Sequence, residues 1–296
     1  MFVTIGALHV DRVARSLPGT SGVDTPAIAF ERLGGTAFNV AVALSRMGVA
    51  ARLLTCLPDD AHGRDIAGQG RSSGIEVIPY WQAGIRAPAF LAHLDASGEL
   101  VSARTVSDLD RWRPDPPYVA AHIRGARCLF ADANLSEEAL LIVADAAAAA
   151  EVPLAVSAVS ESKARRLGVL CAHSSLRYVF MNLAETQVLK NTLNVSLDAL
   201  ADALGASIVM SAGPDGVVLV QPNGQPNLCA EAPTVHMGAG NGNALGMGDA
   251  MAGAFLVYAF SLGNPDLQQA LNAACTVAGF TAASPSAQFR LAEPGQ

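Results

Sequence analysis

Short apolar runs of strand length alternate along this chain with segments that have the periodicity of helices. The expected strands are Phe2–Ala7, Ala51–Leu57, Cys128–Ala131, Leu154–Ser157, Tyr178–Met181, Ile208–Ser211 and Val217–Gln221. Two apolar segments near the end, Asp249–Phe260 and Pro265–Ala283, are expected to be helices. Such alternation is typical of a mostly parallel sheet with helices on its faces. The sequence therefore predicts an α/β fold.

One stretch between Pro88 and Val106 breaks this pattern. Two extended runs, Ala89–Leu94 and Leu100–Val106, flank the turn-forming segment Asp95–Gly98, which predicts a β-hairpin. The hairpin is either an ordinary surface feature or a cover that keeps water away from a reaction. We expect one α/β domain over residues 1–296, with a small β lid inserted around residues 86–108.

The composition narrows the class of protein. With 51% hydrophobic residues the chain can form a large core, and its net charge of −7 does not favour binding to nucleic acid polymers. The start lacks the pattern of a signal peptide, and no apolar run is long enough to span a membrane. Five cysteines without a CxxC pair indicate a reducing compartment, so a cytoplasmic location is expected. Six scattered histidines predict no zinc site.

The segment Gly246-Met247-Gly248-Asp249 is the strongest chemical signal. Glycines permit a tight turn directly before an apolar helix, and such a turn directs backbone N–H groups at a bound anion. A carboxylate facing phosphates is repelled by them, so Asp249 is better explained as the proton acceptor for an attacking hydroxyl. The alternative is that Asp249 only caps the helix.

A second signal is the diglycine Gly34-Gly35, followed by Asn39 one turn into the next helix. Backbone can approach a ligand closely there, and Asn39 can both donate and accept hydrogen bonds to hydroxyls. Asp11 could accept hydrogen bonds from two neighbouring hydroxyls. Each feature also has a plain structural explanation, as punctuation before a helix or as a loop acid. No GxGxxG follows the first strand, which disfavours a dehydrogenase.

Taken in order, these motifs resemble the ribokinase-like (PfkB) family of sugar and nucleoside kinases over nearly the whole chain. The matching segments are Gly6 to Asp11, Gly34 to Gly48, Pro58 to Gly63, Asn182-Leu-Ala-Glu185, Ser211 to Gly216 and Gly246 to Gly253. The resemblance implies a three-layer α/β sandwich with a mostly parallel central sheet and a small β lid.

Within that family the chain looks most like pseudouridine kinases. The similar stretches are Ala131–Leu140, Val159–Lys163, Asp249–Gly253, Phe90–Leu100 and Ser107–Leu109. This likeness implies ATP-dependent phosphorylation of the 5′-hydroxyl of pseudouridine. Alternatives are a kinase for ribose, adenosine, inosine or another ribosyl compound, and a catalytically silent relative that binds nucleosides. A homodimer through the lid and a monomer are equally compatible with the sequence.

The resemblance also implies a role for each matched position. Asp249 would be the general base, and the backbone of Gly246, Met247 and Gly248 would form the anion hole. Asp11, Gly35 and Asn39 would hold the ribosyl hydroxyls. Asn182 and Glu185 would organise the ATP phosphates and Mg²⁺, with Glu185 as the metal residue. The nucleotide side would be lined by Ser211, Gly213 and Gly216.

Several positions depart from the family pattern. Asn243, Ala244 and Leu245 replace an acid and two hydroxyl residues before the anion hole, and Met247 replaces an alanine. Loss of that acid puts a K⁺ site in doubt. Ser157-Ala158 stands where pseudouridine kinases usually have Asp-Pro, and His9 replaces a small polar residue near the sugar.

Overall fold

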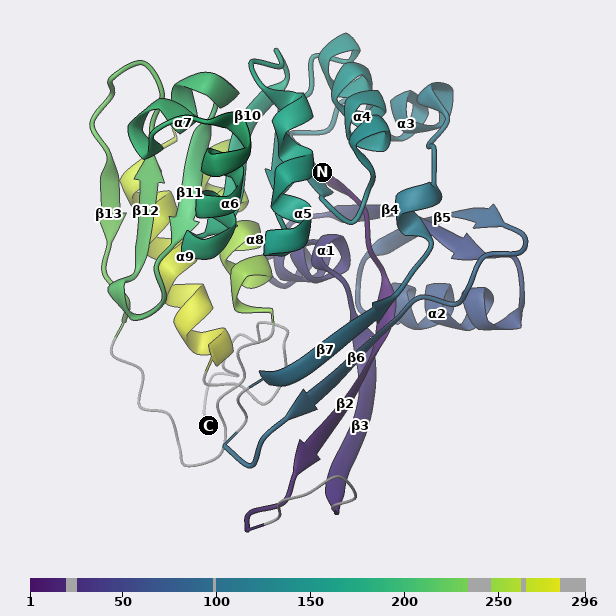
Figure 1. Ribbon diagram of the computed structural model, residues 1–296. Helices are drawn as coiled ribbons and strands as arrows, with labels where there is room; N and C mark the ends of the chain where they lie inside the picture. Colours follow the sequence, from purple (N-terminus) through teal and green to yellow (C-terminus); the bar gives the residue numbers. More distant parts are fainter. Residues whose placement is uncertain (20–25, 98–99, 234–245, 262–264, 283–296) are drawn as a thin grey trace.

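The computed structural model describes residues 1–19, 26–97, 100–233, 246–261 and 265–282, which form two β-sheets and the helices around them (Figure 1). The larger sheet has nine strands in the described part of the chain. In spatial order they are β13 (Leu228–Ala230), β12 (Val217–Val220), β11 (Ser207–Ser211), β10 (Leu176–Asn182), β9 (Leu154–Ser157), β8 (Leu129–Asp132), β1 (Phe2–Ile5), β4 (Ala51–Pro58) and β5 (Glu76–Gln82). All strands from β11 to β5 are parallel, whereas β12 and β13 pair antiparallel at one edge. The predicted mostly parallel sheet is confirmed.

Helices cover both faces of this sheet, because successive side chains of a strand point to opposite sides. Val3 and Ile5 face a core built with α3 (Pro116–Ile123), α4 (Glu137–Ala149), α5 (Glu161–Ala164), α6 (Leu183–Leu193) and α7 (Leu197–Leu204). Phe2 and Phe130 face the opposite core, built with α1 (Thr36–Arg46), α2 (Ala61–Ser72), α8 (Met247–Ser261) and α9 (Leu267–Ala282). The result is three layers. Within the described residues, every helix is too short or too polar to serve as a membrane span.

The second sheet has four strands, in the order β3 (Ala27–Gly34), β2 (His9–Ser16), β6 (Ala89–Leu94) and β7 (Leu100–Val106), and it projects from one end of the sandwich (Figure 1). The predicted hairpin is β6–β7, at the expected residues. Sequence patterns did not predict β2 and β3, because most side chains of β3 are exposed and show no alternation. The lid hairpin at 86–108 is therefore half of a larger sheet, in which β2 pairs parallel to β6.

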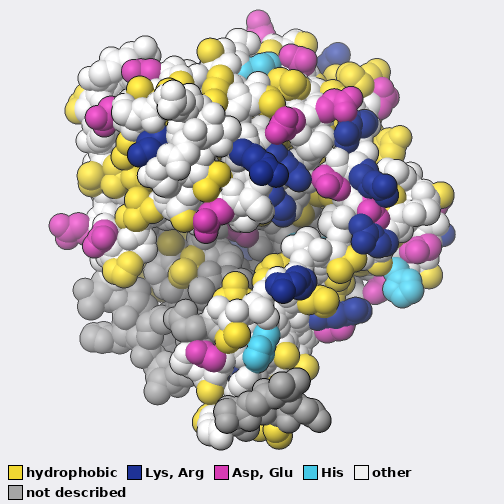
Figure 2. Space-filling model, in the orientation of Figure 1, with side chains coloured by type: hydrophobic (Ala, Val, Ile, Leu, Met, Phe, Trp, Pro, Cys, Tyr) yellow, Lys and Arg dark blue, Asp and Glu magenta, His cyan; other side chains and the backbone are white. Residues whose placement is uncertain are grey.

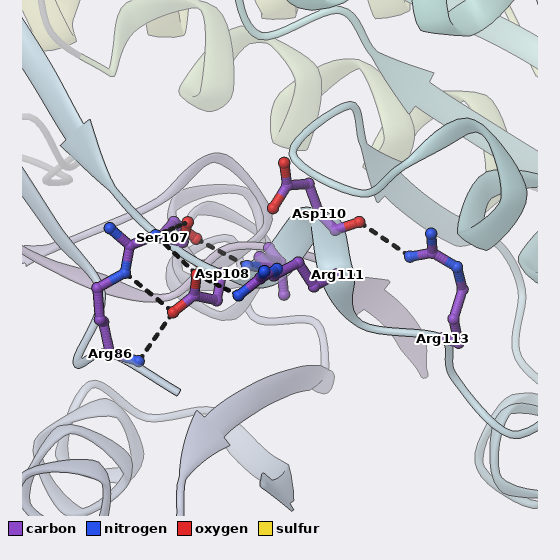
Figure 3. A network of polar contacts seen from close by, with 7 residues as sticks. Arg86, Ser107, Asp108, Asp110, Arg111 and Arg113 are labelled. Carbon is purple, nitrogen blue, oxygen red and sulfur yellow. Dashed lines mark hydrogen bonds and ion pairs between the residues drawn. The ribbon is translucent and has the colours of Figure 1, made fainter. Parts of the chain in front are cut away.

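The two ends of the hairpin are tied together by an ion pair. Arg86, just before β6, donates its backbone N–H and its guanidinium to Asp108, just after β7, with an Nη2–Oδ1 distance of 2.7 Å (Figure 3). These hydrogen bonds lower the pKa of the buried Asp108 carboxyl to about 2. The pair therefore stays charged well into the acidic range and fixes where the hairpin leaves and rejoins the main body.

The large sheet changes direction between β1 and β8. From β1 the chain continues outward to β4 and β5, and from β8 it continues the other way through β9, β10 and β11. In open parallel sheets, ligands bind beyond the carboxyl ends of the strands at such a switch point. The fold therefore places its binding crevice here.

A buried carboxylate joins three segments at this point. Asp132, at the end of β8, is fully buried, and its Oδ2 accepts hydrogen bonds from the backbone N–H groups of Ala7 and Ala37, each at 2.9 Å. Its Oδ1 accepts from the N–H of Asn134 at 3.0 Å. The first strand therefore ends at Ile5 rather than at the predicted Ala7, because the Ala7 N–H binds this side chain instead of a neighbouring strand.

Gly35 must be glycine for the start of α1 to approach the end of β1. Its φ is +109°, and a Cβ there would run into the carbonyl oxygen of Ala7. Gly48, after the same helix, also has a positive φ of +79°, yet no atom lies within 4 Å of the position of its Cβ.

We expect Gly35→Ala to lower the free energy of unfolding by about 3 kcal/mol or more, because it adds a backbone clash to the conformational strain. Gly48→Ala should cost only about 1 kcal/mol, because only the strain remains. Urea titrations of both variants would measure the difference. Equal losses would contradict the close approach at Gly35.

Candidate functional site

A cavity of about 1790 Å³ opens at the carboxyl ends of the parallel strands. Residues of the small sheet line it, including Asp11, Phe90 and Thr105, and so do residues at the ends of successive large-sheet strands, including Asn182 and Ser211. Figure 2 shows the surface hollowed between the main body and the projecting small sheet. A typical pocket for one small ligand measures roughly 300–1,000 Å³, so this cavity has room for two.

The structure brings all the sequence-predicted site residues to this one cavity. They are Asp11, Gly35, Asn39, Asn182, Glu185, Ser211, Gly213, Gly216, Gly246, Met247, Gly248 and Asp249. They come from segments more than 200 residues apart, which periodicity alone could not relate. The positions whose departure from the family pattern puts a K⁺ site in doubt, Asn243, Ala244 and Leu245, lie outside the described residues.

Asp249 lies in the first turn of α8, beside the glycines that precede the helix. α8 begins at Met247, so Asp249 is not the residue that caps it. Its Oδ2 accepts a hydrogen bond of 2.8 Å from Nδ2 of Asn39 on α1. Burial raises the pKa of the Asp249 carboxyl to about 7, assisted by the nearby charges of Asp132 and Asp11 and opposed by hydrogen bonds from Asn39 and Thr36. A carboxyl with this pKa can exchange a proton near neutral pH.

The N-terminus of α8 supplies positive potential next to that carboxylate. The first N–H groups of any α-helix lack partners within the helix, and the helix dipole adds to their attraction for anions. Gly246, with φ +82°, and Gly248 lie at this turn and line the cavity. A developing negative charge would be stabilised here, within reach of a base.

Asp11 lies in β2 rather than in a loop, so the loop-acid alternative is wrong. The carboxylate is buried, and Arg32 of β3 donates its Nε–H to Oδ2 at 3.4 Å. Nδ1 of His9 lies 2.9 Å from Oδ1, and the imidazole stacks on Phe90 with ring centroids 6.0 Å apart. Gly34 is required opposite Asp11, because any Cβ there would collide with the carboxylate.

Asn182 and Glu185 form a capping box at the start of α6. Oδ1 of Asn182 accepts from the N–H of Glu185 at 2.8 Å, and Oε2 of Glu185 accepts from the N–H of Asn182 at 2.9 Å. Burial raises the pKa of the Glu185 carboxyl. The Asn-x-x-Glu spacing therefore has a structural role in addition to placing both residues at the cavity wall.

The fit of Glu185 to Mg²⁺ rests on a single carboxylate. The described residues hold no group of three or more side chains suited to bind a metal. Mg²⁺ commonly keeps several waters and binds one or two carboxylates together with substrate phosphates. Oε1 of Glu185 is not used in the capping box, so the residue fits that mode of binding.

Lys163 is a site residue that sequence reasoning did not single out. Its Nζ donates to Oδ1 of Asn134 at 2.6 Å, and burial lowers the pKa of its ammonium. Arg166 donates to the carbonyl oxygens of residues 133, 134 and 135, which holds that turn in place. Among the described residues that line the cavity, Lys163 and Arg166 are the only lysine and arginine. The only sequence signal for Lys163 was that it ends Val159–Lys163, a stretch that looks like those of pseudouridine kinases.

Comparison with known proteins agrees with this geometry. The pfkB family carbohydrate kinase profile matches residues 2–293. The chain is 28% identical over 269 residues to pseudouridine kinase of Escherichia coli (strain K12), covering 84% of this chain and 80% of that protein.

Solved structures are similar over nearly their whole length. A carbohydrate kinase from Agrobacterium tumefaciens has a TM-score of 0.75 and 28% identity, with 97% of this chain and 92% of that chain covered. Ribokinase from Cryptococcus neoformans var. grubii serotype A, in complex with ADP, has a TM-score of 0.75 and 18% identity, with coverage of 96% and 94%. The chain therefore belongs to the pfkB family of carbohydrate kinases, phosphotransferases that act on hydroxyl groups of sugars and nucleosides, and it has their ribokinase-like fold.

Proposed function

We propose that this protein transfers the γ-phosphoryl group of ATP to the 5′-hydroxyl of pseudouridine, giving pseudouridine 5′-phosphate. The observation that carries the proposal is the Asp249 carboxylate, with a pKa of about 7, at the N-terminus of α8 inside a cavity large enough for two ligands. Similarity to pseudouridine kinase supports the choice of nucleoside.

In this mechanism Asp249 accepts the proton of the 5′-hydroxyl as its oxygen bonds to phosphorus. The bond between the γ-phosphorus and the bridging oxygen breaks, and the leaving oxygen remains on ADP. The N–H groups around Gly246–Gly248 stabilise negative charge on the migrating phosphoryl group. The carboxylate and the amides must act at the same place, which their adjacent positions on α8 provide.

The sugar and the base occupy the end of the cavity near the small sheet. Asp11 accepts hydrogen bonds from ribosyl hydroxyls, and Gly35 lets the backbone approach the ligand. The stacked rings of His9 and Phe90 offer a flat surface for the nucleobase. The small sheet covers this end and excludes water during transfer.

The nucleotide occupies the end near β10 and β11, where Ser211, Gly213 and Gly216 line the cavity. The described cavity lining carries four carboxylates but only two basic side chains. The carboxylates are those of Asp11, Asp110, Glu185 and Asp249. Because a triphosphate is also negatively charged, a bound cation would favour its binding. Bound at Glu185, Mg²⁺ would neutralise phosphate charge. Lys163 also lines the cavity, and among the described lining residues its ammonium is the lysine group available to the transferred phosphoryl group.

Asp249→Asn is expected to lower kcat by about 100-fold or more, because loss of a general base typically costs 10²–10⁴-fold. Binding of ATP should change little, since the amides at α8 remain. In the unsubstituted protein, kcat/KM should rise with pH around a midpoint near 7, because only the ionised carboxylate accepts a proton. Steady-state kinetics with calorimetric ATP titration would check both. Comparable turnover by the variant would reject this role.

Lys163→Met is expected to lower kcat/KM for ATP about tenfold or more, which corresponds to roughly 1.4 kcal/mol of lost interaction with phosphate. The matched control is Lys190→Met, because the chain's other lysine does not line the cavity. ATP titrations at saturating nucleoside would measure the effect. Equal kinetics for the two variants would exclude Lys163 from the phosphate site.

The substrate is tested by measuring ATP consumption with pseudouridine, uridine, adenosine, inosine, cytidine, ribose and fructose 6-phosphate, each with and without K⁺. We expect turnover of pseudouridine but not of uridine, with the phosphate on the 5′-oxygen by ³¹P NMR. Preference for ribose, adenosine or inosine would replace pseudouridine as the substrate. Nucleoside binding without turnover of any compound would indicate a catalytically silent protein.

A further inference from the structure

Helices α1 and α8 approach each other closely beside the cavity. Gly253 on α8 lies against α1 so tightly that a Cβ there would sit 2.7 Å from the Cβ of Ala43 and 3.4 Å from the carbonyl oxygen of Val40. Asn39 lies four residues before Ala43, and Asp249 lies four residues before Gly253, so both are one turn further toward the cavity on the facing sides. The tight contact therefore sets the separation at which Nδ2 of Asn39 donates to Oδ2 of Asp249, 2.8 Å.

The carbonyl oxygen of the Asn39 amide accepts no hydrogen bond from the described residues. Oδ1 of Asn39 is buried without a hydrogen-bond partner among them, although the side chain lines the cavity. A buried acceptor without a partner is costly, and a ligand hydroxyl could supply the missing hydrogen bond. The amide thus has one end on the carboxylate and one end available to a ligand.

We propose that Asn39 is a positioning residue for Asp249: its amide nitrogen fixes the carboxylate toward the cavity and favours the charged form, while its carbonyl oxygen accepts a hydrogen bond from the substrate. One side chain thereby links recognition of the sugar to the orientation and ionisation of the Asp249 carboxylate. This inference rests on the proposed function, because positioning matters for turnover only if Asp249 accepts the proton.

The surroundings of Asp249 explain why we expect this hydrogen bond to have a measurable effect on its pKa. Burial, Asp132 at the end of β8 and Asp11 on β2 all favour the protonated carboxyl. Opposing them are hydrogen bonds from two α1 side chains, Asn39 and Thr36. Without the Asn39 amide, the pKa of Asp249 rises further above its usual value, and less of the base is ionised at neutral pH.

The test compares Asn39→Ala with the unsubstituted protein and with Asn191→Ala, an asparagine-to-alanine control at an exposed position of α6 that does not line the cavity. Titration of ¹³Cγ-labelled aspartates by NMR, with Asp249→Asn to assign the signal, reports the carboxyl directly. We expect the midpoint to rise by about one pH unit in Asn39→Ala, with kcat at pH 7 reduced about fivefold and recovered at pH 9. The control should match the unsubstituted protein.

Asn39→Asp is the second variant, because it keeps the shape of the side chain if Asn39→Ala folds poorly. Its carboxylate would face Asp249, so the shared titration should shift upward by more than that of the alanine variant. An unchanged midpoint in either folded variant, with only the KM for nucleoside raised, would overturn the positioning role and leave Asn39 as a substrate contact. If no compound is phosphorylated, the proposed function fails, while the NMR midpoint still decides whether Asn39 governs Asp249.

Discussion

The Asp132 carboxylate is the interaction on which the geometry of the cavity depends. It accepts backbone N–H groups from the end of β1, the start of α1 and the turn after β8. A fully buried carboxylate is stable only when such donors compensate for the loss of water. Because the three segments meet at the switch point of the sheet, this carboxylate fixes where α1 begins, and with it the positions of Gly35 and Asn39.

The small sheet supplies one wall of the cavity. Its inner side presents Asp11, held by Arg32, and the stacked pair of His9 and Phe90. His9 stands where the family pattern has a small polar residue, and its imidazole lines the cavity beside Asp11. Pairing of two chains through this sheet stays a prediction, as does the pseudouridine preference.

Most of the αβ units were predictable because each carries its own signal, although β5 was not among the expected strands. The β9 strand was expected at Leu154–Ser157 and occurs there, and β6 and β7 also match their expected bounds. β2 and β3 were missed, because Ala27–Gly34 is mostly exposed and pairs with a strand whose register no local pattern specifies. Lys163 was missed as a site residue for a related reason. A single lysine forms no motif with neighbouring residues, so its position in the sequence does not indicate a site.

The sequence by itself determined the class of fold, the glycine turns and the identity of the acid at position 249, since periodicity and glycine placement act over a few residues. Only the tertiary structure decided what that acid touches. The contact of Gly253 with Ala43 brings Asn39 against Asp249 across 210 positions of sequence. Its surroundings in the folded chain, burial first and then the charges of Asp132 and Asp11, raise the pKa of Asp249 to about 7.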